Sequence, residues 1–149
     1  MKLTPQDKSF KQRVKDSFAR QEFMKHIGAE LKNLSPGYCE IQVPYKKELT
    51  QQHGFFHAGV VGTLADNAAG YAAYTLMGAD SSILTVEYKV NLMAPADGEL
   101  LIARSSVLKY GKTLTICRTD VFVRKNGTEK LCAAGQVTLI ELLNKKDGQ

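Results

Sequence analysis

Asp66 is the only charged residue in an apolar stretch, residues 59–76, whose composition is typical of a buried helix. An aspartate is rarely buried unless it is paired or functional, and this stretch contains no Lys, Arg or His to neutralise it. Thr63 could donate a hydrogen bond to the carboxylate. Burial should raise the pKa of the carboxyl, which suits a general base. The alternative is that Asp66 lies beside Asn67 on a solvent-facing strip of the helix.

A second candidate site lies at the start of this stretch, where His57-Ala58-Gly59 would open the helix. Gly54 gives the preceding loop conformational freedom. The N terminus of a helix presents unpaired backbone N–H donors and a partial positive charge, so it can bind the oxygen of a polarised carbonyl. The alternative is that His57 only caps the helix.

Other catalytic motifs are missing from the sequence. His53 and His57 are four residues apart but form no H-E-x-x-H motif, so we expect no metal site. There is no G-x-S-x-G motif of the serine hydrolases. Gly111-Lys112-Thr113 matches only the end of a phosphate-binding loop and is predicted to lie in a hairpin. The Tyr and Phe residues form no RNA-binding strand motif.

The elements that would carry these residues follow from the hydrophobic pattern. Residues 6–27 repeat apolar side chains at helical spacing, and residues 59–76 form a longer helix that is apolar on almost all sides. Asn126-Gly127 is typical of a tight hairpin. Short turns favour antiparallel neighbours, so we expect an α+β domain whose antiparallel sheet, of about five to six strands, wraps around the buried helix. The predicted strands are 38–45, 82–93, 99–109, 113–124 and 129–140.

The length of 149 residues indicates one domain, with a basic helical segment at 1–33 and a polar tail at 142–149. A hydrophobic fraction of 44% excludes a disordered chain. No apolar run reaches the ~18 residues of a membrane span, and the N terminus does not look like a secretory signal. The three cysteines form no C-x-x-C pair, which indicates a reduced, cytoplasmic protein without disulfides or a zinc site. They are Cys39, Cys117 and Cys132.

The net charge of +5 is concentrated near the N terminus, because residues 1–33 hold eight Lys or Arg and four Asp or Glu. Such a segment could contact nucleic acid or an anionic membrane. The alternative, which we favour, is a solvated amphipathic helix, so we expect neither of these partners. A nucleic-acid-binding protein would lose affinity steeply as salt is added.

Residues 51–66 (QQHGFFHAGVVGTLAD) resemble the signature of hotdog-fold acyl-CoA thioesterases of the PaaI-like, phenylacetic-acid-degradation type. In that signature an Asn is followed three residues later by Gly, then by His-Gly-Gly, and by an Asp nine residues after the His. Gly54, His57 and Asp66 match it. Residues 85–96 and 111–114 are similar to later strands of the family, so the resemblance covers about residues 35–141.

The resemblance implies a thioester hydrolase that acts on an acyl- or aryl-CoA as a homodimer, often paired into a homotetramer. Asp66 of one subunit would act as general base or nucleophile on the thioester carbonyl. The backbone N–H of Ala58 in the other subunit would bind the oxyanion. His57 would help to place the thioester, and Thr85 would orient the water or the acid. Coenzyme A is part of the substrate, so no separate cofactor is implied.

Two residues depart from the family signature. Gln51 stands where the family has Asn and is one methylene longer, although it would still hold a water. Ala58 replaces the first Gly of His-Gly-Gly and keeps the N–H donor unless a positive φ is required there. Arg104 and Arg118 are candidates to bind the CoA phosphates. The other residues expected to bind substrate are Gly54, Gly59, Lys112 and Thr113.

The main alternative is a non-catalytic acyl-CoA-binding or sensing protein with the same fold. Such a protein would keep the pocket without needing the chemistry of Asp66. The sequence also leaves the acyl group open, because the nearby aromatic residues would either line an acyl pocket or fill the core. These residues are Phe55, Phe56, Tyr71 and Tyr74.

Overall fold

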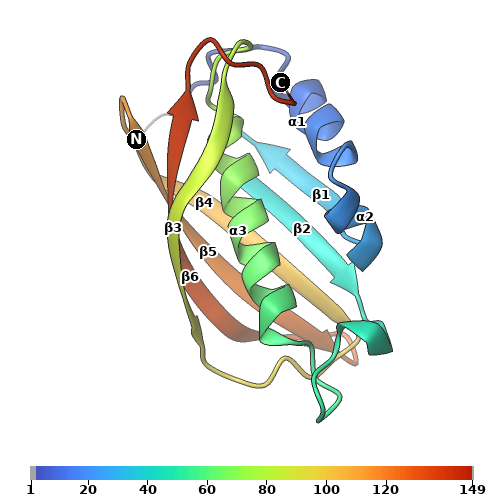
Figure 1. The fold of residues 1–149 in the computed structure, drawn as a ribbon. Coiled ribbons are helices and arrows are strands. Elements are labelled where there is room, and N and C mark those ends of the chain that lie inside the picture. The colour runs from blue at the N-terminus through green and yellow to red at the C-terminus, as the bar shows by residue number, and fades with distance from the viewer. Residues whose placement is uncertain (1–2, 149) are drawn as a thin grey trace.

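The structure, a computed structural model, describes residues 3–148. Within these residues six strands form one antiparallel sheet in the order β1-β2-β4-β5-β6-β3, and the long helix α3 crosses one face of that sheet (Figure 1). The helices are α1 (Phe10–Ala19), α2 (Glu22–Ile27), a short 3₁₀ helix (Lys47–Leu49) and α3 (Ala58–Tyr74). The strands are β1 (Glu30–Ser35), β2 (Tyr38–Pro44), β3 (Ser82–Leu92), β4 (Leu100–Tyr110), β5 (Leu114–Lys125) and β6 (Thr128–Leu142).

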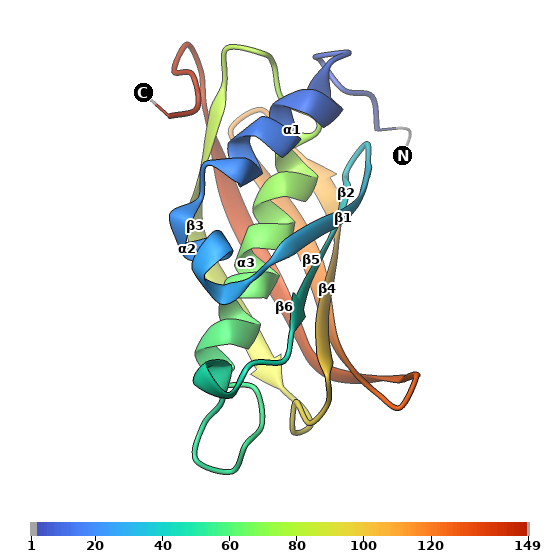
Figure 2. The same ribbon diagram turned by 90° about the vertical axis from the view of Figure 1, so that its right-hand side faces the viewer.

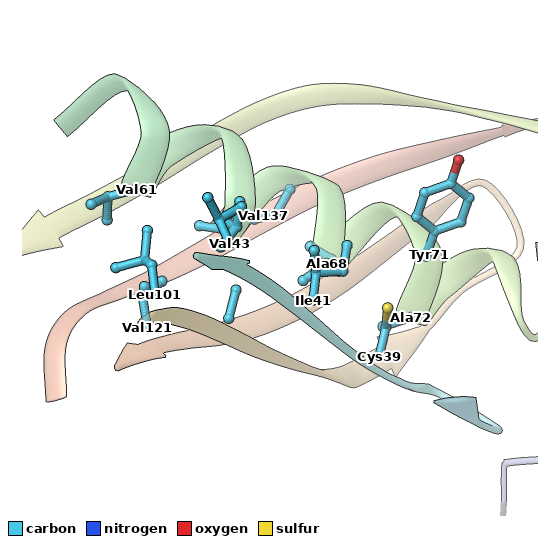
Figure 3. Close-up of a cluster of buried hydrophobic side chains, with 14 of the residues drawn as sticks. Cys39, Ile41, Val43, Val61, Ala68, Tyr71, Ala72, Leu101, Val121 and Val137 are labelled. Carbon is cyan, nitrogen blue, oxygen red and sulfur yellow. The ribbon is translucent and has the colours of Figure 1, made fainter. Parts of the chain in front are cut away.

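The core lies between α3 and the inner face of the sheet (Figure 3). The alternating residues Cys39, Ile41 and Val43 of β2 all point towards the helix and have no exposed surface. The helix contributes mainly small side chains to this contact, which allow its backbone to lie close to the strands. The alanines that are completely buried on α3 are Ala65, Ala68, Ala69, Ala72 and Ala73.

The predicted fold class is confirmed. The helix predicted at 59–76 is α3, and the five predicted strands are β2 to β6, each within two residues of its predicted bounds. Asn126 and Gly127 have φ values of 51° and 78°, and two positive φ values are what a type I′ hairpin turn requires. The helix is buried on nearly all sides, so its sequence is apolar on nearly all sides, and this composition made it predictable.

The N-terminal segment differs from the prediction. The single helix expected at 6–27 is two helices, and α2 ends at Gly28, whose φ of 75° is the left-handed conformation typical of a helix C terminus. Residues 30–35, which overlap the end of the segment 1–33 expected to be helical, form strand β1. A register shift between Leu31 and Asn33 interrupts the apolar alternation of this exposed edge strand, which hid it from sequence analysis.

Helix α1 is attached to the C-terminal end of α3 through Arg13. Its Nη2 donates to the carbonyl oxygens of Tyr74 (3.2 Å) and Met77 (2.7 Å), and its Nε lies 2.9 Å from Asp7 Oδ2. The guanidinium also stacks 4.1 Å from the Tyr74 ring centroid. Arg13 is therefore a structural residue of the basic segment.

No helix within residues 3–148 is both long and apolar enough to cross a membrane.

The C-terminal tail returns to α1, where Arg20 Nη2 and Asp147 Oδ2 form an ion pair of 2.6 Å. Figure 1 shows this last part of the chain beside α1, and Figure 2 shows α1 crossing in front of α3. The polar tail predicted from residue 142 begins after the last strand residue, Leu142, and it contributes Asp147 and Gly148 to a cavity described below.

Strand β3 lies at one edge of the sheet and has no strand on its outer side among the described residues (Figure 1). Its alternating apolar side chains are exposed: Leu84 by 58%, Val86 by 55%, Tyr88 by 52% and Leu92 by 58%. An unpaired edge with apolar side chains is an open template for pairing with another chain.

Candidate active site

Asp66 lies in the middle of α3 with its carboxylate directed at β3. Thr85 Oγ1 donates a hydrogen bond of 2.7 Å to Asp66 Oδ1, which joins the central helix to the edge strand. Asp66 and Asn67 are both half-buried, so the carboxylate lies neither in the core nor on a fully exposed face of the helix. Thr63 donates to the carbonyl oxygen of Gly59 instead of to this carboxylate.

The pKa of Asp66 is raised above its ordinary value. Burial is the main cause, because it disfavours the charged carboxylate, and the hydrogen bond from Thr85 opposes the rise. No lysine, arginine or histidine among residues 3–148 forms an ion pair with Asp66. A partly desolvated carboxylate with no cationic partner is a stronger base than an ordinary aspartate.

Asp66 and Thr85 line a cavity of about 330 Å³ between α1, α3, β3 and the C-terminal tail, hereafter the first cavity. Part of its wall is a chain of hydrogen bonds. Gln21 Oε1 accepts from Asn67 Nδ2 (2.9 Å), Gln21 Nε2 donates to Tyr71 Oη (2.7 Å), and that hydroxyl lies 3.0 Å from Ser17 Oγ. The remaining lining includes Arg20, Gly70, Ile83, Leu84 and Leu139.

The N terminus of α3 is capped by His57. Its Nδ1 accepts the N–H of Gly59 at 2.8 Å, so a neutral ring carries its proton on Nε2. A Cβ at Gly59 would lie 3.0 Å from the same Nδ1, so a side chain there would displace the cap. His57 therefore caps the helix, and its Nε2 remains available to a ligand. This geometry is compatible both with a capping role alone and with a role in placing the thioester.

Ala58 is the first residue of α3, and its N–H has no hydrogen-bond partner among residues 3–148. Its φ is not positive, so the replacement of the family's Gly by Ala causes no backbone strain. The N–H donor proposed for the oxyanion is therefore present and free.

The loop before α3 holds the other predicted residues. Gln51 Oε1 accepts the backbone N–H of His53, and the Gln51 carbonyl accepts the N–H of Gly54 at 3.0 Å. Gly54 has a φ of 82°, which explains the glycine. Gln51 and Ala58 line a second cavity of about 450 Å³, which is mainly apolar. Its other lining includes Phe55, Val61, Leu92, Met93 and Cys132.

The predicted site residues therefore fall into two groups within one chain. Asp66 and Thr85 line the first cavity, whereas Gln51 and Ala58 line the second. Ala58 and Asp66 are eight residues apart on one helix, a rise of about 12 Å, so the Ala58 N–H and the Asp66 carboxylate cannot contact one thioester carbonyl within a single chain.

The predicted phosphate-binding residues lie outside both cavities. Lys112 and Thr113 are exposed in the turn between β4 and β5. Arg104 is held by Glu40 at 2.9 Å and by Glu129 at 2.7 Å, and its hydrogen bond lowers the pKa of Glu129 to about 2. Arg118 pairs with Asp120 at 3.1 Å. Arg104 is therefore less available to a phosphate than Lys112.

Sequence analysis did not identify Ser17 or Gln21 as cavity residues, because the packing of α1 on α3 is a tertiary contact that no local pattern reports. Gly70, which lines the same cavity, lies four residues after Asp66 and so on the same face of the helix. Of the aromatic candidates, Phe55 and Phe56 line the second cavity and Tyr71 the first, while Tyr74 is buried in the core.

Metal and thiol chemistry have no support in the geometry. Residues 3–148 contain no cluster of His, Cys, Asp and Glu side chains that could bind a metal ion. The three cysteines are free and buried, and burial raises the pKa of each thiol. A buried thiol of this kind is unreactive.

Comparison with known proteins identifies the family of this chain. Residues 53–130 match the thioesterase superfamily. Human acyl-coenzyme A thioesterase 13 is 30% identical over 139 residues, which cover 91% of this chain and 96% of that protein. The crystal structure of a thioesterase family protein from Silicibacter pomeroyi has a TM-score of 0.89 at 46% identity, covering 90% of this chain and 98% of that chain.

The PaaI protein of the E. coli phenylacetic acid degradation operon has the same fold, with a TM-score of 0.80 at 16% identity over 90% of this chain and 94% of that one. The resemblance predicted from residues 51–66 is thereby confirmed at the level of family and fold. The chain belongs to the thioesterase superfamily and has its hotdog fold.

Proposed function

We propose that this thioester hydrolase cleaves acyl-CoA to a free acid and coenzyme A, with Asp66 as general base or nucleophile. The observation that carries the proposal is the Asp66–Thr85 pair at the first cavity. Thr85 holds Oδ1, which leaves Oδ2 to face a water or the thioester carbonyl. Human acyl-coenzyme A thioesterase 13, a relative over most of the chain, supports the choice of substrate class.

A thioester needs less machinery than an amide or an oxygen ester. Its carbonyl is electrophilic and its leaving thiolate is stable, so one carboxylate and one oxyanion donor can suffice. The free N–H of Ala58, at the positive end of the α3 dipole, is suited to the negative oxygen that develops as the carbonyl is attacked. His57 Nε2 and the amide of Gln51 lie on the same loop, where they would orient the thioester or a water.

The two halves of the site would meet in a homodimer formed through β3. Leu84 and Thr85 at the start of β3 line the first cavity, and Leu92 at its end lines the second. If β3 pairs antiparallel with a second copy, the start of one strand lies beside the end of the other. The Asp66 of one subunit would then face the Ala58 N–H of its partner, and the exposed apolar residues of β3 would be buried.

The remaining predicted residues have supporting roles in this proposal. Gly54 and Gly59 shape the loop and the cap beside the oxyanion donor, as their φ and close contact indicate. Lys112 and Thr113, on an exposed turn, are candidates for the phosphates of CoA only where a neighbouring subunit completes the surface. Pairing of dimers into a tetramer would provide such a surface.

The test is thiol release from acetyl-, hexanoyl-, palmitoyl- and benzoyl-CoA, with wild type beside Asp66→Asn. The matched control is Asp80→Asn, which removes an exposed carboxylate from the turn before β3. We expect turnover in wild type and in the control and none in Asp66→Asn. Turnover in Asp66→Asn would refute the catalytic assignment. Binding of acyl-CoA without turnover in wild type would favour the non-catalytic binding protein.

A further inference from the structure

Helix α3 contains three glycines, and their surroundings differ. A Cβ at Gly59 would be 3.0 Å from the His57 ring, and one at Gly62 would be 3.6 Å from the Tyr88 hydroxyl. At Gly70 the nearest atom to a Cβ would be Leu139 Cδ2 at 3.9 Å. The protein therefore leaves room for a methyl group at Gly70, although glycine weakens a helix. Packing within the chain does not explain this glycine.

Gly70 lies one helical turn after Asp66 on the same face of α3, and both residues line the first cavity. The apolar part of the cavity wall is formed by Ile83, Leu84 and Leu139, and Leu139 faces Gly70. A group attached to a carbonyl at Asp66 would thus pass directly over the missing side chain of Gly70.

The cavity also has a polar wall. The Tyr71 hydroxyl accepts from Gln21 and bonds to Ser17, and the Arg20–Asp147 ion pair joins the end of α1 to the tail. These groups already have partners, so an apolar chain that reached them would separate charges and hydrogen bonds without compensation. This polar wall therefore disfavours an apolar ligand that reaches it.

The volume supports a compact ligand. A cavity of about 150 Å³ holds a benzene molecule. The first cavity, at about 330 Å³, is large enough for a short chain or a single ring. Its apolar part at Gly70 is the section through which such a group must pass.

We propose that Gly70 is a specificity-determining residue, which keeps the first cavity open for a compact acyl group beside Asp66. This inference rests on the proposed function, since it assigns the first cavity to the acyl part of an acyl-CoA. A side chain at position 70 would fill the space over which the acyl group lies. It would discriminate against larger acyl groups more strongly than against an acetyl group.

The test uses Gly70→Ala and Gly70→Val, with kcat/KM measured for acetyl-, hexanoyl-, benzoyl- and palmitoyl-CoA. We expect the ratio of kcat/KM for hexanoyl-CoA over acetyl-CoA to fall about tenfold in Gly70→Ala and further in Gly70→Val, since one methylene in an apolar pocket discriminates roughly 10–200-fold. The ratio for benzoyl-CoA should fall in parallel. Palmitoyl-CoA should be a poor substrate already in wild type.

The matched control is Gly62→Ala, the same change on the same helix outside the first cavity, which should leave the ratios as in wild type. Gly70→Ala should also have a higher thermal midpoint than wild type, because alanine favours the helix and has room. A loss of activity towards larger substrates in a more stable protein cannot come from misfolding.

Failure of the role proposed for Gly70 can be distinguished from failure of the proposed function. If wild type hydrolyses acyl-CoA and the ratios do not change in Gly70→Val, the role of Gly70 is refuted and the proposed function stands. If wild type hydrolyses none of the four, the proposed function fails. The dissociation constants of hexanoyl- and acetyl-CoA then decide: a ratio unchanged by Gly70→Val overturns the assignment of the cavity.

Discussion

Thr85 Oγ1 lies 2.7 Å from Asp66 Oδ1, and this one hydrogen bond joins an edge strand of the sheet to the middle of the central helix. The carboxylate is therefore held at the boundary between the core and the exposed edge of β3. Burial raises the pKa of Asp66, and the hydrogen bond from Thr85 on β3 reduces that rise. Any partner that covers β3 would bury this pair further.

Removing this hydrogen bond should change the pH profile of the enzyme. Thr85 stabilises the ionised form of Asp66, so Thr85→Val should raise the Asp66 pKa and move the acid limb of kcat to higher pH. On the acid limb we expect kcat to fall about tenfold, since less of Asp66 is ionised there and a hydrogen bond to a charged group is worth roughly 1.5–3 kcal/mol. Thr85→Ser keeps the donor and serves as the control. An acid limb at the same pH in Thr85→Val would contradict this role.

The same carboxylate should cost stability at neutral pH. Because the folded pKa of Asp66 is raised, the folded state binds more protons than the unfolded state in the window between the ordinary value of 3.8 and the raised value. Stability therefore falls as pH rises through that window, and the full cost is present above it. Asp66→Asn, whose amide oxygen still accepts from Thr85, should melt at a higher temperature than wild type at pH 7.

Thermal melting at two pH values checks this expectation. The difference between Asp66→Asn and wild type should vanish below the ordinary carboxyl value, where both side chains are neutral. Asp80→Asn, at an exposed carboxylate, should show no comparable gain. An Asp66→Asn protein that is no more stable than wild type at pH 7 would show that the carboxylate is better solvated than its burial indicates.

Arg13 should contribute strongly to stability although it lies in the basic segment. Arg13→Met removes two hydrogen bonds to carbonyl oxygens at the end of α3, the ion pair with Asp7 and the stacking on Tyr74. We expect a loss of about 3 kcal/mol in the free energy of unfolding, measured with urea. Lys15→Met, at an exposed position of α1, should change it by less than about 0.5 kcal/mol.

The contrast between Arg13 and β1 shows what the sequence could and could not predict. The central helix was predictable because its apolar composition indicates burial on nearly all sides. Strand β2 was predictable because Cys39, Ile41 and Val43 recur at every second position. Strand β1 was not, because a register shift breaks its alternation and most of its side chains are exposed. Arg13 looked like one basic residue among eight, since its partners Tyr74 and Met77 are about sixty residues away.

The candidate site, like the fold, was predictable only in part. Asp66 stood out because a charge in an apolar helix is unusual, and the Ala58 N–H followed from the position of the helix start. The wall formed by Ser17, Gln21 and Tyr71 depends on where α1 packs, which no local pattern reports. The separation of Asp66 and Ala58 by about 12 Å along one helix is also a fact of geometry, and it leads to the last two predictions.

Ala58→Pro should remove the oxyanion donor without disturbing the helix. Ala58 is the first residue of α3, where proline is favoured, and the preceding His57 has the extended φ of −63° and ψ of 142° that proline requires of its neighbour. We expect kcat to fall roughly 10²–10³-fold, as for loss of an oxyanion-hole donor, with little change in thermal midpoint. Ala58→Gly keeps the N–H and separates the donor from the side chain.

Mixing two inactive variants should restore activity if each site takes Asp66 from one subunit and the Ala58 N–H from the other. Asp66→Asn retains the donor, and Ala58→Pro retains the carboxylate. A mixed dimer then has one intact site and one with both defects. Co-refolding the two at equal amounts should recover about one quarter of wild-type activity, because half of the dimers are mixed and each has one of its two sites intact. Each variant refolded alone gives the baseline, and a mixture no more active than that baseline would place the whole site within one chain.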